Sequence, residues 1–396
     1  MNGFDISTIS GLYVGSTEYS AIYKGSTLLW QATLDYSKEY FTIESLTDNN
    51  QIKFMASSSD LTKTIEWSTN KVNWTSVTSS TVAEDAILTT LNTNEKIYIR
   101  GNNTQYCTGN NSYNYFVCSG NHKVSGNIMS LLYGSNFKNQ YTLESNRTFY
   151  KLFDSDLRCV DASNLILPAT TLTSYCYGYM FSGCTSLTAA PELPATKCFS
   201  TCYYSMFRNC ISLTTAPELP ATKLEVYCYY GMFSGCTSLT AAPELPATTL
   251  ANYCYQNMFY NCESLTTAPE LPATTLANYC YSRMFQSCDR LTAAPELPAT
   301  TLANYCYQYM FMGCPITTAP ELPATTLVTG CYDSMFYFCS SLKYVKAMFT
   351  NYSSDYTNNW LGYVSSTGTF VKNINATIST GASGIPSGWT IETVAA

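Results

Sequence analysis

The residues of this chain that are best suited to chemistry form a regular column of glutamates. The segment APELP occurs six times, with successive copies 26 residues apart and the last pair 25 apart. Its glutamates are Glu192, Glu218, Glu244, Glu270, Glu296 and Glu321. Proline cannot donate a hydrogen bond within a β-ladder, so a glutamate flanked by prolines is expected at the corner where an extended segment ends.

The dielectric surroundings of such a column determine how strongly its carboxylates repel one another. Carboxylates on repeats about 5 Å apart repel by about 3 kcal/mol at an effective dielectric constant of about 20, but by under about 1 kcal/mol in water. We therefore expect a solvated column. Its oxygens could accept hydrogen bonds from backbone N–H groups or threonine hydroxyls, or they could bind bridging Ca²⁺ ions. We favour the hydrogen bonds, because no second acidic residue recurs at a fixed offset, and we predict no metal and no cofactor.

Cysteine is the second abundant reactive residue, with 18 copies in the chain. Fourteen of them form two columns, Cys176, Cys202, Cys228, Cys254, Cys280, Cys306 and Cys331, and Cys184, Cys210, Cys236, Cys262, Cys288, Cys314 and Cys339. Two cysteines eight residues apart on a helix would be about 12 Å apart, whereas a disulfide needs Cα atoms within about 7 Å. We predict buried free thiols. The state of Cys107, Cys118, Cys159 and Cys198 stays open.

Signatures of an active site are missing from the sequence. The single histidine, His122, lies in the loop-like segment CSGNHKVSG without an evident carboxylate partner, and we expect it at the surface. No phosphate-binding loop, nucleophile elbow or zinc-ligand spacing occurs. The sequence therefore predicts that the protein is not an enzyme.

Composition narrows the class of protein further. Hydrophobic residues make up 46% of the chain and charged residues 12%, with a net charge of −7. No basic run and no stretch of 18 apolar residues occurs, so we expect neither a nucleic-acid partner nor membrane insertion. The first residues lack the basic and apolar regions of a secretory signal. We expect either a mature secreted chain or release without a signal, as in virion assembly.

The repeat unit positions both sets of residues, as in residues 246–271, PATTLANYCYQNMFYNCESLTTAPEL. Its Leu250, Cys254, Met258 and Cys262 recur every four residues, which predicts one apolar face of a helix. The segment SLTTAPEL then predicts a short strand with Leu265 in the core. Such a unit must stack on its neighbours. We predict an α/β fold, a right-handed solenoid with a parallel β-sheet over residues 149–349, built from one degenerate and seven clear repeats.

The repeat pattern LPxTxLxxxCYxxMFxxCxSLTxAPEL resembles the BspA-like leucine-rich repeats of bacterial and phage-encoded surface proteins. The resemblance implies an extracellular binding protein and covers about half of the chain. Residues 1–36 are similar to a small attachment segment of phage tail and adhesin proteins, and residues 350–396 to the tails that follow such repeats.

The remaining segments differ in kind from the repeats. Residues 37–105 contain short alternating runs, which predict a β-sandwich, with a hairpin between Trp67 and Trp74. These tryptophans could form a sugar platform, but we favour core packing. Residues 106–148 are predicted to connect this domain to the solenoid, and residues 350–396 to form a β cap.

These features favour a virion-associated adhesin, of the tail-fibre or accessory-fibre type, that binds a host cell-surface protein or glycan. Virion proteins would contact the N-terminal segment, and a homo-oligomer is possible. The alternatives are a bacterial surface or secreted adhesin and a purely structural virion decoration protein. We expect the tyrosine column that includes Tyr255 to pack inside the solenoid. The variable positions expected to face a ligand are Gln256, Asn257, Ser282, Arg283 and Gln308.

Overall fold

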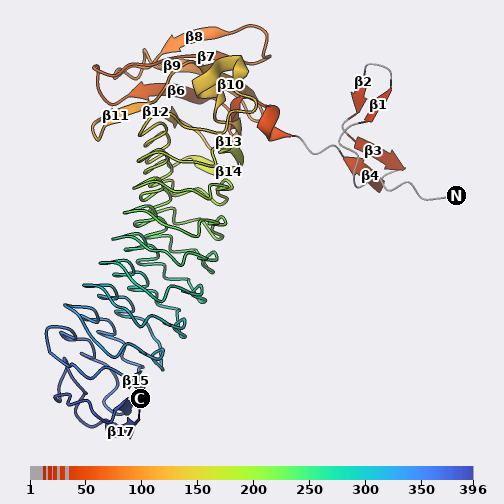
Figure 1. Ribbon diagram of the computed structural model, residues 1–396. Helices are drawn as coiled ribbons and strands as arrows, with labels where there is room; N and C mark the ends of the chain where they lie inside the picture. Colours follow the sequence, from red (N-terminus) through yellow and green to blue (C-terminus); the bar gives the residue numbers. More distant parts are fainter. Residues whose placement is uncertain (1–11, 15–16, 20, 25–26, 32–34, 396) are drawn as a thin grey trace.

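The computed structural model describes residues 12–14, 17–19, 21–24, 27–31 and 35–395. A β-rich unit is followed by a long stack of rungs, which ends at the C-terminal strands (Figure 1). Before this unit, β1 (Leu12–Val14) pairs with β2 (Thr17–Tyr19), and β3 (Ala21–Lys24) pairs with β4 (Thr27–Gln31). The proposed attachment role of residues 1–36 falls largely outside the described residues.

Two sheets form the β-rich unit. The larger has the strand order β14-β13-β5-β10-β7-β8 and the smaller β11-β12-β6-β9. Their strands are β5 (Phe41–Ser45), β6 (Asn50–Ala56), β7 (Thr64–Ser68), β8 (Thr75–Thr78), β9 (Ile87–Leu91), β10 (Lys96–Gly101), β11 (Cys107–Gly109), β12 (Ser112–Cys118), β13 (His122–Asn127) and β14 (Cys159–Ile166). Alternate side chains of β6 are buried, as its sequence pattern requires. Phe41 of one sheet meets Phe116 of the other, with ring centroids 5.5 Å apart.

The predicted boundary of the β-rich unit at residue 105 is wrong. Strands β11 to β13 lie in the interval assigned to a connecting region, and they complete both sheets. The interval also holds α1 (Ser130–Tyr133) and the 3-10 turn η2 (Gly134–Asn136), while η1 (Tyr36–Lys38) precedes β5. Strand β13 lies between β5, which it pairs antiparallel, and β14, which it pairs parallel. The sheet therefore leads directly into the first rung of the repeat stack.

The predicted hairpin around the two tryptophans is present, because β7 pairs antiparallel with β8. Trp67 packs against the core, and the ring of Trp74 lies 4.0 Å from the guanidinium of Arg100. Tyr40 also contacts Trp74 edge-on, with ring centroids 5.0 Å apart. Both rings are thus only partly exposed, in agreement with a packing role.

The predicted helices of the repeats are absent, and the α/β assignment is wrong. Residues 167–343 form a run of turns with isolated β-bridges. Each rung has three left-handed residues spaced four apart, such as Tyr253, Asn257 and Asn261, with φ of 62°, 58° and 58°. The pairs Cys254–Tyr255 and Met258–Phe259 that follow these residues are both buried. A chain of four-residue turns therefore produces the same apolar spacing as a helix.

Hydrogen bonds in each rung alternate in direction along the chain. The N–H of Met258 donates to the carbonyl of Tyr255 in its own rung, at 3.1 Å. The next N–H, that of Phe259, donates to Met284 in the following rung, at 3.0 Å. An α-helix would direct every such bond four residues back. Half of the N–H groups of this segment thus tie one rung to the next.

The continuous parallel sheet is also replaced, by two lines of isolated parallel bridges. One line runs through Thr215, Ala241 and Thr267, and the other includes the bridges Lys223–Thr249 and Thr275–Thr301. The prolines of APELP interrupt the ladder between these lines, because they lack an N–H donor. Parallel strands of several residues occur only at the ends of the described stack, at β14 and at β15 (Tyr344–Ala347), β16 (Thr369–Asn373) and β17 (Thr390–Val394).

Identical side chains stack through the centre of the rungs. Tyrosine rings from successive rungs are nearly parallel, with centroids 5.7 to 5.9 Å apart, and a phenylalanine column runs beside them. The inward packing predicted for the tyrosine column is confirmed for Tyr177, Tyr203, Tyr229, Tyr255, Tyr281, Tyr307 and Tyr332. Leu265 is likewise fully buried, as predicted.

Both cysteine columns are buried, and all 18 cysteines are free thiols. The reason is not the helical spacing assumed from the sequence. In the second column each thiol donates to the carbonyl of a phenylalanine in the preceding rung, as Cys262 does to Phe233 at 3.2 Å. Cysteine suits this position because it is small, apolar and still a weak donor. The four cysteines outside the columns are buried as well.

The left-handed turns predict an inverted response to glycine and alanine at position 261. Asn261 shares its column with Gly183, Gly235 and Gly313, which also have positive φ. Asn261→Gly should be more stable than Asn261→Ala by about 1 kcal/mol, because only glycine adopts this backbone without steric cost. In a helix the order would be reversed by about the same amount. Denaturant titration of the two variants measures the difference. A more stable alanine variant would contradict the left-handed turn and support the predicted helix.

The buried thiols predict a loss of stability at high pH. Burial raises the pKa of Cys254 from its ordinary value of 9.0 to about 12, and it also raises the pKa of Tyr255. Above pH 9 the cysteines of the unfolded chain ionise while those of the folded chain stay neutral, which favours unfolding. The free energy of unfolding is therefore highest below pH 9 and falls as the pH rises toward 12. Melting temperatures followed by circular dichroism should fall above pH 9. Rapid labelling of the repeat cysteines in the native protein at pH 8 would contradict their burial.

Candidate functional site

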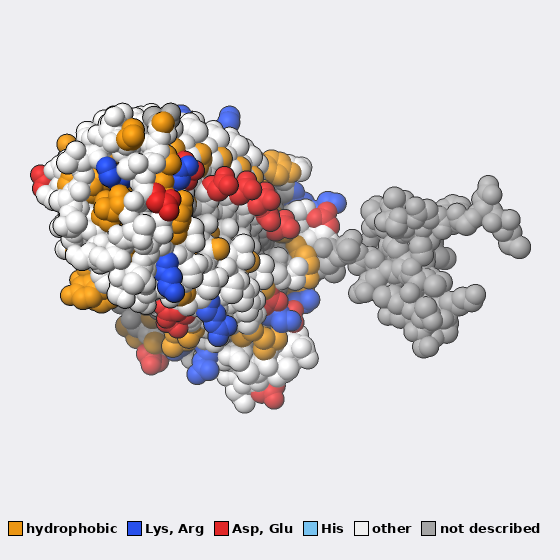
Figure 2. Space-filling model, turned by 90° about the horizontal axis from the view of Figure 1, so that it is seen from below, with side chains coloured by type: hydrophobic (Ala, Val, Ile, Leu, Met, Phe, Trp, Pro, Cys, Tyr) orange, Lys and Arg blue, Asp and Glu red, His pale blue; other side chains and the backbone are white. Residues whose placement is uncertain are grey.

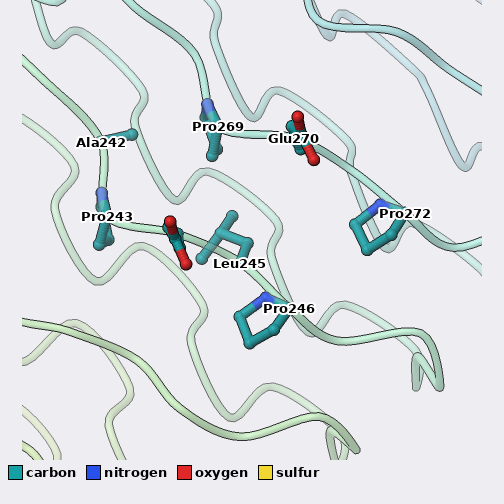
Figure 3. A pocket seen from close by; sticks show the side chains of 8 residues that line it. Ala242, Pro243, Leu245, Pro246, Pro269, Glu270 and Pro272 are labelled. Carbon is teal, nitrogen blue, oxygen red and sulfur yellow. The ribbon is translucent and has the colours of Figure 1, made fainter.

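The glutamate column lies on the surface, on a side of the stack that we call the proline–glutamate face. This face consists of the six APELP segments, whose glutamates are all exposed. Between two rungs, Glu244 and Glu270 line one hollow of about 370 Å³ with the prolines on either side of them (Figure 3). Its lining thus combines apolar proline rings with two exposed carboxylates.

The same hollow recurs along the stack because the rungs repeat. A hollow of about 440 Å³ lies between the segments of Glu192 and Glu218. Another, of about 260 Å³, lies between those of Glu270 and Glu296. The face is therefore a row of equivalent shallow hollows rather than one deep pocket.

The hydrogen bonds predicted for the glutamates are not formed. Among the described residues, the partner of this column is Lys346, whose Nζ lies 2.8 Å from Oε1 of Glu321. This bond raises the pKa of Lys346. Threonine hydroxyls donate to backbone carbonyls instead, as Thr266 does to Thr240 at 3.1 Å. The other five carboxylates are solvated, in agreement with the predicted wet column, and acidic side chains form a row on one side of the molecule (Figure 2).

Two of the five predicted ligand-facing residues lie together on another part of the repeat surface. Asn257 and Arg283 line a hollow of about 210 Å³ that also includes Tyr230. Asn257 donates to the hydroxyl of Tyr230 at 3.0 Å, and the guanidinium of Arg283 lies 4.6 Å from the ring of Tyr309. These contacts hold both side chains in place at the surface.

The other three predicted positions are not part of this hollow. Gln308 donates to Asp333 at 2.9 Å, and Gln256 is partly exposed. Ser282 is fully buried, so its prediction as a ligand-facing residue is wrong. It occupies the same repeat position as Gln256 and Gln308, which are partly exposed, but its shorter side chain does not reach the surface.

A row of partly exposed tyrosines was not predicted from the sequence. Tyr227, Tyr253, Tyr279 and Tyr305 stack with ring centroids 4.5 to 4.9 Å apart. Each occupies a left-handed position immediately before a cysteine of the first column. The recurrence of tyrosine before that cysteine was the available signal, but a helical reading gives no reason for it to face outward.

His122 is also misplaced by the sequence prediction. Its side chain is fully buried, and Nε2 lies 3.2 Å from Oδ2 of Asp156. Cys118 belongs to the same buried group. The parallel pairing of β13 with β14 brings these residues together, and nothing in the local sequence around His122 indicates that pairing.

Comparison with protein-family models gave one match, to the BspA type leucine rich repeat region, with six copies over residues 150–292 and 255–360. The matched span coincides with the stacked rungs and includes most of the proline–glutamate face. No curated protein and no solved structure matched the chain. In the described part of the chain, no helix has the length and apolar character needed to cross a bilayer.

The solvated glutamates predict that Glu270→Gln does not destabilise the protein. The change removes repulsion from the neighbouring carboxylates and breaks no hydrogen bond. The free energy of unfolding should therefore change by less than about 0.5 kcal/mol. Thermal melting at low salt measures this, with and without added Ca²⁺. A midpoint that calcium raises in the parent but not in the variant would show a calcium-binding column instead.

Proposed function

Because the chain belongs to the BspA type leucine-rich repeat proteins, we propose that it is an extracellular adhesion protein that binds a partner protein through its stack of rungs. Proteins with these repeats are typically found outside the cell or at its surface, which supports this location. Stacked repeats also give extended surfaces suited to holding partners. We propose a binding role without catalysis.

The proline–glutamate face is the surface best suited to this role. Its row of equivalent hollows, each edged by exposed carboxylates, is the observation that carries the proposal. Five of the six carboxylates are left without an ion-pair partner among the described residues, so they are available to a ligand. The rigid rungs hold them at regular spacing, which lowers the entropy cost of binding.

The chemistry of this face favours a basic, extended polypeptide as the partner. The aliphatic stem of a lysine or arginine can pack on the prolines while its charged group reaches a carboxylate. An extended chain presents side chains on one side at every second residue. It can therefore follow several rungs, and many weak contacts then add up along the face.

The finer proposal is that the protein is a virion-associated adhesin, of the tail-fibre or accessory-fibre type, that binds a host cell-surface protein. The similarity of residues 1–36 to attachment segments of phage tail proteins supports this version. A bacterial surface adhesin would use the same face and differ only in its anchorage. A decoration protein would have no ligand on the face.

A glycan ligand is the second candidate, and the partly exposed tyrosine row favours it. Stacked rings such as Tyr253 and Tyr279 offer flat apolar area beside polar groups, which suits a sugar. Arg283 and Asn257 lie on neighbouring rungs and could supply hydrogen bonds. This candidate places the ligand away from the proline–glutamate face.

Binding of the full chain to a peptide array and to a glycan array distinguishes the two candidates. We expect lysine- and arginine-rich peptides to be retained, with affinity that falls as salt rises. A triple variant, Glu244→Gln, Glu270→Gln and Glu296→Gln, should lose at least about tenfold in affinity, equivalent to about 1.4 kcal/mol. Glu263→Gln, which removes an exposed carboxylate from a different part of the same rung, is the matched control and should bind normally.

The opposite pattern would overturn the use of this face. If basic peptides are not enriched, or if the triple variant binds them as the parent does, the proline–glutamate face is not the binding surface. Retention of glycans that Tyr279→Ala abolishes would instead assign the function to the tyrosine row.

A further inference from the structure

A buried group of three metal-ligand side chains joins the β-rich unit to the first rung. Cys118 ends β12, His122 begins β13, and Asp156 lies in the turn that precedes β14. Their ligand atoms all lie within 4.8 Å of one another, and all three residues are buried. The three come from both sheets and from the repeat stack.

The imidazole and the carboxylate face each other without forming a hydrogen bond. Nε2 of His122 and Oδ2 of Asp156 are 3.2 Å apart, yet each is buried with no hydrogen-bond partner. Groups of this kind are costly to bury unless something satisfies them. The two atoms are partners only if His122 is protonated, so with a neutral imidazole both lack a partner and a bound cation would satisfy them.

The remaining polar atoms of both side chains are already used. Nδ1 of His122 lies 3.3 Å from the carbonyl of Gly120, a position from which it donates and leaves Nε2 with a free lone pair. Oδ1 of Asp156 accepts from the backbone N–H of Arg158 at 3.1 Å, which leaves Oδ2 free. Backbone support of this type is what orients the ligands of metal sites.

The spacing agrees with a tetrahedral metal ion. With metal–nitrogen and metal–oxygen bonds of about 2.0 to 2.1 Å, the two ligand atoms of a tetrahedral zinc site are about 3.3 Å apart. The observed separation of 3.2 Å fits this edge. The thiol of Cys118 lies within the same 4.8 Å limit and would need only a small approach.

We propose that Cys118, His122 and Asp156 bind one zinc ion, which fastens the β-rich unit to the first rung of the stack. The mixed sulfur, nitrogen and oxygen donors match zinc and disfavour calcium or magnesium, which prefer oxygen alone. Cys159 is the candidate fourth ligand. It is fully buried and lies opposite His122 in the ladder between β13 and β14, but its thiol is outside the group within 4.8 Å and would have to move toward the ion.

The site would be structural rather than catalytic. All of its side chains are buried, so no substrate has access to the ion. Since the ligands join segments that are distant in sequence, an ion bound to the folded state alone would raise the melting temperature. The competing interpretation is a plain ion pair between a protonated His122 and Asp156, with Cys118 as a neighbouring apolar thiol.

The single histidine makes a direct test possible in the full chain. Labelling histidine with ¹⁵N gives one pair of ring-nitrogen signals, which belong to His122. On addition of zinc we expect the Nε2 signal to shift to that of a metal-bound nitrogen, with saturation close to one ion per chain. Cobalt should give tetrahedral absorption bands together with a thiolate-to-cobalt band, which reports Cys118.

Variants then identify the ligands by zinc content and by the effect of zinc on the melting temperature. Cys118→Ser and Asp156→Asn should lose the bound ion and the stabilisation of several degrees that zinc gives the parent. Cys107→Ser, a buried cysteine of the same unit outside the group, is the matched control and should keep both. If a ligand variant fails to fold, the histidine signal and the cobalt spectrum of the parent decide alone.

The proposal fails if zinc leaves the histidine signals and the melting temperature of the parent unchanged. It also fails if both ring nitrogens prove to be protonated and zinc does not displace the proton, because His122 and Asp156 then form the ion pair. Binding that persists in Cys118→Ser and Asp156→Asn alike would place the ion elsewhere.

Discussion

The alternation of backbone hydrogen bonds is the constraint on which the repeat stack depends. One N–H of each neighbouring pair closes a turn within its rung, and the other donates to the next rung. This alternation covers the turn segment of each rung, where three left-handed residues spaced four apart make it possible. Since every rung uses the same pattern, the side chains at equivalent positions must lie above one another, and the columns of tyrosine, phenylalanine and cysteine follow from it.

Column stacking in turn explains the unusual composition of the core. A ring in one rung has to pack on an identical ring about one rung away, which nearly parallel tyrosines and phenylalanines do well. The phenylalanine carbonyl accepts both a backbone N–H and a thiol, as Phe233 does from Cys236 and Cys262. Cysteine is small enough for this buried position, and a purely apolar residue would leave that carbonyl with a single donor. The same regularity leaves the glutamates stacked at the surface, where solvent screens their charges.

Much of this arrangement could be predicted from the sequence, because a 26-residue period with fixed apolar positions allows little besides stacking. The buried positions of Tyr255 and Leu265 follow from the apolar period, and the solvated glutamate column follows from the flanking prolines and from charge repulsion. The apolar spacing does not distinguish a helix from the observed turns, because turns of four residues and an α-helix give nearly the same spacing. The glycine, asparagine or serine before six of the seven cysteines of the second column was the distinguishing signal, since glycine and asparagine in particular tolerate a left-handed backbone. The surroundings of His122 could not be predicted from the sequence, because they depend on one parallel strand pairing between distant segments.

Because each rung is bonded only to its two neighbours, the number of rungs is not fixed by any contact between the ends of the stack. One rung is already a residue shorter, with Ile316 buried in the place of the usual leucine, and the columns continue through it. Loss or duplication of a whole repeat in the gene would shorten or lengthen the molecule while leaving every interface of the remaining rungs intact. Near-identical copies such as ELPATTLANYCY are the segments at which such exchange aligns most readily. The reach of the protein, and the number of hollows on its surface, can therefore evolve in whole steps without redesign of the core.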